Sequence, residues 1–530
     1  MNDLVECPAN SSIPHRRPSG SIAVGPDSRL GVESLEQAAL RPSSRVKLTP
    51  RGRADVRASH VAFRKLVAEK VPIYGVTTGV GPLVVHGKAE AEAEQGGETL
   101  LDHLGVGCGR SAPAPVVRAC MILRAHVLAQ GSSGVRPSVL RGLMGLIHRG
   151  VVPVVPRVGS LGASGDLIPL SYVARVLVGR GTALVDGRPS AARMALGKAG
   201  LRPVSLSSRD ALGLVNGTSF LTAYAALAVA RAERLIGHAE ALTGWLFALL
   251  GCREDCLDPR LHNARGHQGS RISASAILAE SRRIGAFPDP SRPLQEIYSI
   301  RCAPQILGAC RDQVAYARSL IEDEMNSVSD NPLIVPGDFA RALHGGNFHG
   351  QHVAFAADAL NAALTQAAVL ADRQVDALLN PKINGGAPML LAARPGPMSG
   401  LAGAQLASTA LVAEMRLRAQ AIATSSIPSN GGNQDVVPMA NLAARAAYAQ
   451  TGALASVLAV LGMSLGQLDG LRRRGLAPGR STGSPSWMPR FQPMLRDRPL
   501  RGDLRRIARA WLAPVGSLPP DAPGRATQIA

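Results

Sequence analysis

The residues with the most distinctive chemistry are Ala163, Ser164 and Gly165, within residues 158–170 (VGSLGASGDLIPL). In a tight bend, the amide nitrogen of Gly165 can attack the carbonyl carbon of Ala163, and glycine supplies the backbone freedom for such a bend. Cyclisation and loss of two waters would leave an exocyclic methylene on a conjugated ring, an electrophile that no ordinary side chain provides. Taken alone, these residues also fit a simple turn in which Asp166 caps the following helix.

Six further segments decide between the two interpretations: 74–83 (YGVTTGVGPL), 215–219 (VNGTS), 295–305 (QEIYSIRCAPQ), 326–332 (NSVSDNP), 344–348 (HGGNF) and 433–437 (NQDVV). In this order they resemble the motifs of the aromatic amino acid ammonia-lyases and aminomutases, over a span from about Lys47 to about Gly470. The resemblance implies that residues 163–165 form 4-methylidene-imidazol-5-one (MIO) autocatalytically, without any metal. It also implies that MIO takes up the substrate amine and makes it a leaving group.

Elimination of ammonia also needs a base close to the β-carbon, because the β-proton is barely acidic. The resemblance implies Tyr74 for this role, carried on a mobile glycine-rich lid loop. A phenol works as a base only if its pKa is lowered from about 10, and positive potential from helix N-termini is the family's way of lowering it.

The resemblance also implies which residues hold the MIO ring and the substrate. Arg301 is the expected anchor of the substrate carboxylate, because a planar guanidinium binds a carboxylate through two hydrogen bonds. The other expected positions are Asn216 and Tyr298 beside the ring and the substrate amine, Phe348 packed beside the ring, and Gln295 and Asn433 orienting the carboxylate and the MIO carbonyl.

Two places indicate the substrate. His103 and Leu104 stand where tyrosine-selective lyases of the family resemble His-Leu, phenylalanine lyases Phe-Leu and histidine lyases Ser-His. His103 can hydrogen-bond a phenol hydroxyl while Leu104 packs on the ring, and such a site discriminates by up to ~10⁴ to 10⁵. Gln434 stands where histidine lyases carry Glu. Together these residues favour elimination from L-tyrosine to trans-4-coumarate, ahead of tyrosine 2,3-aminomutase and of phenylalanine or histidine ammonia-lyase.

Three residues depart from the family pattern. Val80 replaces the usual Phe of the lid motif and could loosen the lid, whose tightness separates a lyase from a mutase. Asp102 could hydrogen-bond His103 and raise its pKa or orient its tautomer. Pro438 replaces the usual Ser, and we expect it to cap the next helix.

These residues need long elements to position them. After residue 215 the chain changes to stretches with few helix breakers, which predict helices over about 216–251, 304–328, 350–379, 401–424 and 439–469. We expect a mobile leader (1–40), a mixed N-terminal MIO-bearing domain with the lid loop (41–215), a central long-helix bundle (216–470) and a basic C-terminal tail (471–530). The resemblance implies a mainly α, fumarase/aspartase-like (histidase-type) fold and a homotetramer with active sites shared between subunits.

Composition excludes several classes of protein. Hydrophobic residues make up 46% of the 530 residues and aromatic ones only 3%, which fits a globular protein with an aliphatic core. The longest apolar stretches, 221–230 and 241–252, are shorter than the roughly 18 residues of a membrane span. The seven cysteines are thinly spread, the N-terminus has no apolar signal segment, and we therefore expect a cytoplasmic protein with reduced thiols.

Two features suggest other partners. The net charge is +20, and residues 471–530 carry twelve Arg against three Asp. Without interleaved aromatics or a nucleic-acid motif this is a solvated tail, and we do not expect a nucleic-acid partner. A catalytically silent family member with a nucleic-acid-binding tail is the alternative, against which the intact Tyr74, Arg301 and 163–165 argue. Cys252, Cys256, His262 and His267 suggest zinc, but the loop after Cys256 is too short for a finger.

Overall fold

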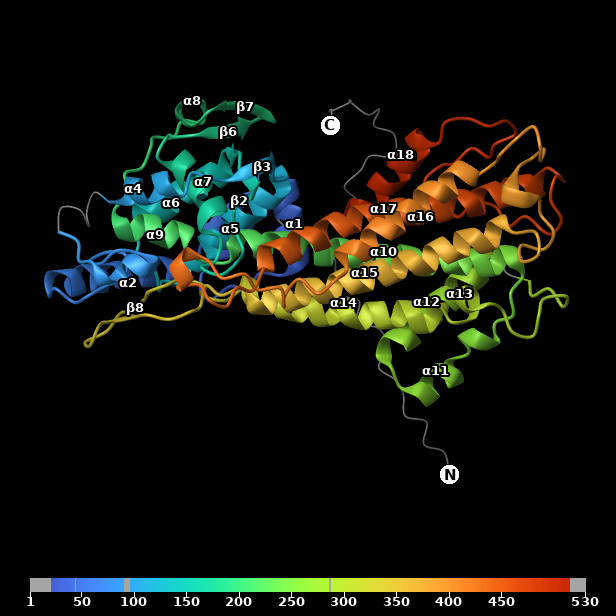
Figure 1. Ribbon diagram of the computed structural model, residues 1–530, viewed down its shortest axis with the longest axis horizontal. Coiled ribbons are helices and arrows are strands. Elements are labelled where there is room, and N and C mark those ends of the chain that lie inside the picture. The colour runs from blue at the N-terminus through green and yellow to red at the C-terminus, as the bar shows by residue number, and fades with distance from the viewer. Residues whose placement is uncertain (1–20, 43, 90–95, 286, 515–530) are drawn as a thin grey trace.

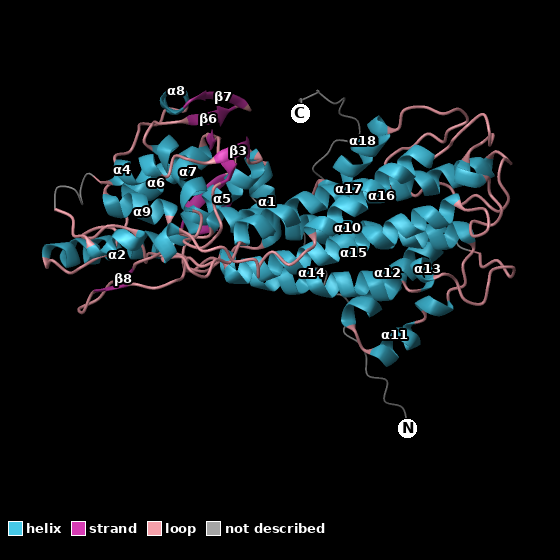
Figure 2. Ribbon diagram, in the orientation of Figure 1, coloured by secondary structure: helices cyan, strands magenta, loops and turns pink. Residues whose placement is uncertain are grey.

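The computed structural model describes residues 21–42, 44–89, 96–285 and 287–514. Helices dominate, and strands are few and short (Figure 2). One end of the elongated molecule is a mixed region of short helices and small sheets, and the rest is a bundle of long helices (Figure 1). The expected mainly α fold is therefore confirmed.

The bundle is built from five long helices that pack along one another: α10 (Ser219–Leu250), α12 (Gln268–Ile284), α14 (Ala303–Met325), α15 (Gln351–Leu379) and α17 (Ala440–Arg473). The elements around them are η2 (Asp255–Leu257), α11 (Pro259–Arg265), α13 (Tyr298–Arg301), η3 (Met389–Leu391), α16 (Ala402–Arg418), η4 (Asn430–Gly432) and α18 (Arg501–Leu512). At 1.5 Å per residue, α10 alone is about 48 Å long. The expected helix positions agree with these bounds to within a few residues, except at the end of α16.

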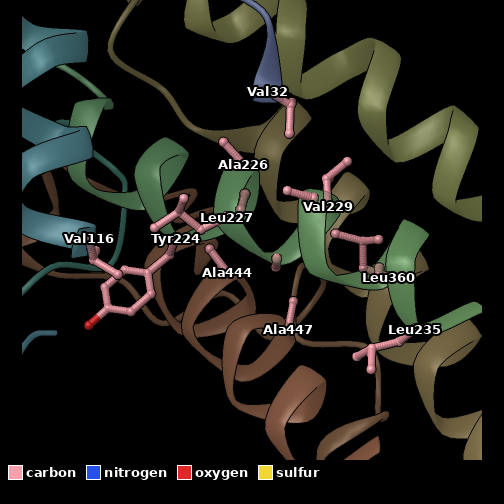
Figure 3. Close-up of a cluster of buried hydrophobic side chains, with 14 of the residues drawn as sticks. Val32, Val116, Tyr224, Ala226, Leu227, Val229, Leu235, Leu360, Ala444 and Ala447 are labelled. Carbon is pink, nitrogen blue, oxygen red and sulfur yellow. The ribbon is translucent and has the colours of Figure 1, made fainter. Parts of the chain in front are cut away.

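Small side chains explain how closely the helices pack. Figure 3 shows Ala226 and Val229 of α10, Ala444 and Ala447 of α17 and Leu360 of α15 within one cluster of buried side chains. All these residues are fully buried. Alanine allows neighbouring helix backbones to approach closely, so a core with few aromatic residues still reaches high packing density.

The mixed region carries most of the strands. Its helical elements are α1 (Val32–Leu40), α2 (Pro50–Ala68), η1 (Gly81–Val85), α4 (Gly97–His103), α5 (Ala114–Ala129), α6 (Pro137–His148), α7 (Leu167–Leu177), α8 (Ala192–Lys198) and α9 (Ser208–Val215). Its strands are β1 (Ser21–Val24), β2 (Arg45–Leu48), β3 (Cys108–Ser111), β4 (Val152–Pro153), β5 (Pro156–Val158), β6 (Thr182–Val185) and β7 (Arg188–Ala191); β8 (Leu333–Val335) and β9 (Arg341–Leu343) form a hairpin beside α2. The pairs are β1–β2 (parallel), β3–β5, β4–β6–β7 and β8–β9 (antiparallel).

The direction of the long helices determines which residues meet at the mixed region. Helices α10, α15 and α17 all begin there, whereas α14 ends there and begins at the far end of the bundle. The contacts that fix this arrangement are Gly350 N to Gly162 O (3.0 Å), before α15, and Asn441 Nδ2 to Asp166 Oδ1 (3.3 Å), in α17. Three helix N-termini therefore converge on the segment around Ser164.

The expected leader is wrong for residues 21–40. Strand β1 pairs with β2, and α1 buries Val32, Leu35 and Ala39 against the core. The apolar residues of α1 recur at helical spacing, but the segment around them is rich in Pro, Ser and Gly, and this composition led to the prediction of a mobile leader. Residues 1–20 lie outside the described residues.

The expected solvated tail is also wrong for its first part. Helix α18 packs on α17 and buries Ile507, Ala508 and Trp511, while Arg472 donates to the carbonyl oxygens of Leu249 and Pro478. Arginine here serves partly as a buried donor to carbonyl groups. Residues 515–530 lie outside the described residues.

Two helices, α15 and α17, are long and apolar enough to cross a membrane by length and composition. Their most apolar windows are 67% and 83% buried against the rest of the protein. Core helices of a bundle pass the same test of length and composition, so these helices need no membrane to bury their apolar faces.

Candidate active site

The Ala163-Ser164-Gly165 segment forms a turn that only glycine can complete. Gly162 and Gly165 have φ values of +78° and +67°, in the left-handed region. A Cβ atom on Gly165 would lie 2.3 Å from the carbonyl oxygen of Gly217, and Asp166 N donates to this same oxygen at 2.7 Å. The turn is thus pressed against the segment that leads into α10.

Two amide side chains hold Ser164 from opposite parts of the chain. Asn216, the C-cap of α9, donates its Nδ2 to the carbonyl oxygen of Ser164 at 3.0 Å. Gln434 donates its Nε2 to the Ser164 hydroxyl at 2.7 Å and is itself oriented by Ser429. The carbonyl of Ser164 is the group that would become the ring carbonyl, and its hydroxyl is one of the oxygens that would leave as water.

Asp166 fixes the turn to the helix N-termini. Its carboxylate accepts from the amides of Phe220 and Leu221 at 2.9 and 2.8 Å, in the first turn of α10, and from the Ser160 hydroxyl at 2.8 Å. Complete burial raises the pKa of Asp166 to about 6, although these hydrogen bonds act in the opposite direction. The converging helix N-termini add positive potential around the turn.

Tyr74 lies on the lid loop that faces the turn. Its hydroxyl accepts a hydrogen bond from the amide of Gly81 at 2.6 Å, and its backbone amide donates to His344 Nε2 at 3.1 Å. The loop closes on itself through a bridge between Thr78 and Gly87. An amide N–H aimed at the phenolic oxygen stabilises negative charge on that oxygen.

One cavity of about 500 Å³ is lined by six of the thirteen expected site residues. It collects residues from the lid, the turn, the 326–332 and 344–348 motifs and the segment before α17. Its lining residues are Tyr74, Gly81, Val84, Ala163, Ser164, Asn331, Phe348, His349, Asn433, Gln434, Asp435 and Val436.

His103 and Leu104 lie at the end of α4, on the other side of the lid. His103 is exposed in a second cavity of about 580 Å³, lined also by Gly75, Gly79 and Val80 of the lid, whereas Leu104 is buried. The lid loop therefore borders both cavities.

The expected interaction of Asp102 with His103 is not the one that forms. The Asp102 carboxylate instead accepts from Arg175 at 3.3 Å and from Arg180 at 3.2 Å. Two guanidinium groups compete more effectively for a carboxylate than one imidazole. Pro438 likewise does not occupy a first helical turn, because α17 begins at Ala440 with Met439 as its N-cap.

Tyr298 and Arg301, in α13, lie away from this cavity, at the opposite end of the bundle (Figure 1), and Gln295 stands three residues before α13 in the chain. Helix α13 precedes α14, whose 23 residues separate it from the Asn331 region by about 35 Å. The Arg301 guanidinium stacks on the Tyr298 ring at 4.7 Å, its buried Nε has no partner among the described residues, and Tyr298 is 69% exposed. Within one chain, Arg301, the expected carboxylate anchor, and the turn do not share a site.

Several residues that support the site had no predicted role. His344 holds the Tyr74 backbone. Asp330 forms a buried ion pair with Arg209 at 2.8 Å, and Arg124 donates to the carbonyl of Gly213, just before Asn216. His344 and Asp330 fall inside quoted motifs, so their positions carried a signal. Arg124 and Arg209 stand outside the motifs, and only their burial reveals them.

The residues around Ser164 fit an MIO group. The buried Oδ1 of Asn216 has no partner among the described residues, although its Nδ2 is engaged. The space beside Gly165 excludes any side chain, so the backbone there can approach Gly217 closely. A long-bundle fold with such a turn at converging helix N-termini defines the histidase-type class of helical enzymes.

The comparisons with known proteins agree with this class. A sequence profile described as aromatic amino acid lyase matches residues 30–486. A histidine ammonia-lyase of Treponema denticola is 36% identical over 457 residues, covering 85% of this chain and 89% of the relative. A tyrosine ammonia-lyase of Cupriavidus metallidurans is 38% identical over 463 residues, covering 82% and 84%.

Solved structures give the same result. A tyrosine aminomutase from Streptomyces globisporus superposes with a TM-score of 0.84 at 33% identity, covering 93% of this chain and 97% of the other. This protein belongs to the aromatic amino acid lyase family, which comprises ammonia-lyases and aminomutases.

Proposed function

We propose that this protein is an MIO-dependent tyrosine ammonia-lyase, which converts L-tyrosine to trans-4-coumarate and ammonia in the cytoplasm. The observation that carries the proposal is the geometry of the turn, with Asn216 and Gln434 bonded to Ser164 and Tyr74 lining the same cavity. When formed, the MIO group supplies an electrophilic methylidene that activates the substrate amine.

The chain's own residues then divide the remaining work. Asn216 draws electron density toward the Ser164 carbonyl oxygen, which makes an attached conjugated system more electrophilic. Tyr74, as the phenolate, accepts the β-proton at its phenolic oxygen, and the Gly81 amide stabilises the negative charge that this oxygen carries before the transfer. The lid that carries Tyr74 excludes water from the reacting atoms.

The tyrosine preference rests on His103 and Gln434. Exposed in a cavity bordered by the lid, His103 is free to hydrogen-bond a phenolic hydroxyl, and Gln434 is neutral where histidine lyases carry a carboxylate. A pocket that pairs a hydroxyl leaves its polar group unsatisfied with phenylalanine, so it discriminates strongly.

We also propose a homotetramer with shared active sites. Because Arg301 and Tyr298 lie about 35 Å from the Asn331 region of the same chain, another subunit would have to bring its α13 to the turn. The exposed apolar side chains around α13, Leu294, Ile297 and Tyr298, fit a surface that becomes covered.

Parallel assays with L-tyrosine, L-phenylalanine and L-histidine test the activity. Product absorbance distinguishes coumarate, cinnamate and urocanate, and β-amino acid analysis of the same samples detects a mutase. We expect coumarate chiefly from tyrosine, and an intact mass lower than the sequence mass by two waters. A Ser164→Ala variant is the matched control, since it lacks the hydroxyl that must leave and should show neither activity nor the mass loss.

Other outcomes assign other functions. Urocanate with little coumarate would contradict the tyrosine assignment, and β-tyrosine would identify an aminomutase, whose lid must retain the product. Inactivity with all three substrates, in protein with an unchanged mass, would overturn the enzyme proposal. That result would favour the alternative, a catalytically silent family member with a nucleic-acid-binding tail.

A further inference from the structure

Helix α7 makes a series of contacts with the segment 101–107, which contains His103 and Leu104. The contacts come from Ser171, Tyr172 and Arg175, which project from neighbouring faces of the helix. Ser171 Oγ is fully buried and shares its one hydrogen between the carbonyl oxygens of Ile168, at 2.7 Å, and Leu104, at 3.2 Å. The bond to Leu104 fixes the backbone at the end of α4.

Tyr172 holds the following residues. Its hydroxyl accepts a hydrogen bond from the amide of Gly107 at 3.1 Å. A Cβ atom on Gly107 would lie 3.1 Å from both the Tyr172 ring and Pro156, so this backbone passes closely between them. Glycines at 105 and 107 give the segment little stiffness of its own, and Val106 is 67% exposed. The Tyr172 contact therefore supplies order that the segment lacks.

Arg175 holds the same segment from its other side. Its guanidinium donates to the Leu101 carbonyl oxygen and to the Asp102 carboxylate, both at 3.3 Å. Arg180, just after the helix, adds bonds to Asp102 and to Glu98. Asp102, which precedes His103, is thereby tied to α7 rather than to His103.

The other end of α7 is joined to the turn. The helix begins directly after Asp166, which caps it and is bonded to the first turn of α10. Leu170, Val173, Ala174 and Leu177 bury the remaining faces of α7 in the core. A rigid element thus connects residues 163–165 to residues 101–107.

We propose that Ser171, Tyr172 and Arg175 are positioning residues for substrate selectivity, holding His103 and Leu104 in register with the 163–165 turn. This inference rests on the proposed function, because it concerns the residues that choose the substrate. These side chains act through the backbone of 101–107, without contact with the substrate.

The test is a Tyr172→Phe variant, which keeps the ring and removes the acceptor for Gly107. We expect kcat/KM for L-tyrosine to fall about fivefold to tenfold, mainly through KM, the loss typical of one hydrogen bond. The value for L-phenylalanine should stay within about twofold, because that substrate has no hydroxyl for His103 to bind. Ser171→Ala should shift the ratio in the same direction.

Tyr316→Phe, at a tyrosine that is 50% exposed on α14, makes the same chemical change away from α7 and should leave both values unchanged. Intact mass shows that the prosthetic group has formed in each variant. A parallel fall in kcat/KM with both substrates, or an unchanged preference for tyrosine in Tyr172→Phe and Ser171→Ala, would overturn the positioning role. Either result would leave the proposed function standing. A wild-type enzyme without a preference for tyrosine would overturn the proposed substrate and this inference together.

Discussion

At the scale of single residues, the site depends on polar groups that are buried and satisfied. Asp166 is completely buried, yet no cationic side chain forms an ion pair with it among the described residues. Its carboxylate instead accepts hydrogen bonds from two backbone amides and from the Ser160 hydroxyl. Hydrogen bonds from backbone amides fix a carboxylate more rigidly than a mobile side chain does. The residue that follows the turn of residues 163–165 is therefore held firmly in place.

The raised pKa of Asp166 predicts a pH dependence of stability. The folded protein keeps the proton up to pH of about 6, whereas an unfolded aspartate loses it near 3.8. Unfolding between these values releases a proton, so raising the pH favours the unfolded state. We expect wild type to lose about 2–3 kcal/mol of unfolding free energy relative to Asp166→Asn between pH 4 and 7.

Thermal unfolding of both proteins across this range measures the effect. As the pH rises to about 7, the melting temperature of wild type should fall relative to that of Asp166→Asn. Above pH of about 7 the difference should stay constant. Asp255→Asn, at an aspartate that is 72% exposed, serves as the control and should show no such trend. A constant gap between Asp166→Asn and wild type would mean that Asp166 is ionised throughout.

At the scale of elements, the lid depends on the backbone of Gly75. Its φ is +71°, and a Cβ atom there would lie 2.7 Å from Leu212 Cδ2 and 3.2 Å from Val80 Cγ1. A left-handed conformation costs a non-glycine residue about 1–2 kcal/mol before any clash. Gly75→Ala should displace Tyr74 and lower kcat/KM at least tenfold, measured with the preferred substrate.

The matched control is Gly87→Ala in the same loop, where the nearest atom to a new Cβ is 3.9 Å away. This variant should keep nearly full activity. Both variants should show the mass loss of two waters, because the turn lies outside the lid. Full activity in Gly75→Ala would show that the lid adapts without moving Tyr74.

The sequence predicts the elements better than their partners. The long helices follow from stretches without breakers, and Asn216 follows from a motif that the resemblance places beside the MIO ring. Gln434 was expected only to indicate the substrate, and its bond to the Ser164 hydroxyl was not predicted. The partner of Asp102 was not predictable, because Arg175 lies 73 residues away and only the packing of α7 on α4 brings them together. Composition also concealed α1, since its apolar positions are few and surrounded by turn-forming residues.

At the scale of the whole molecule, the bundle separates residues that the proposed reaction needs in one site. Ser164 lies where α10, α15 and α17 begin, and Arg301 lies where α14 begins. Gln374, near the end of α15, donates to the Ser299 carbonyl at 3.0 Å and fixes α13 at that far end. A rigid bundle cannot fold back on itself, so under the proposed function only a second subunit could supply Arg301 to the turn.

Shared sites predict complementation between two inactive variants. Ser164→Ala lacks the turn's hydroxyl and Arg301→Ala lacks the carboxylate anchor, so each homotetramer should be nearly inactive. In tetramers assembled from both chains, a site is intact when its turn comes from an Arg301→Ala chain and its anchor from a Ser164→Ala chain. With equal amounts and random assembly, about one quarter of sites meet this condition.

Co-expression of the two variants with different tags, purification through both tags and assay of the mixed tetramers measures the recovery. Activity near a quarter of wild type would show that turn and anchor come from different subunits. Mixing the separately purified variants without dissociation is the control and should restore nothing. Mixed tetramers as inactive as either parent would mean that both groups act from one chain, which would require α13 to leave its position on α15.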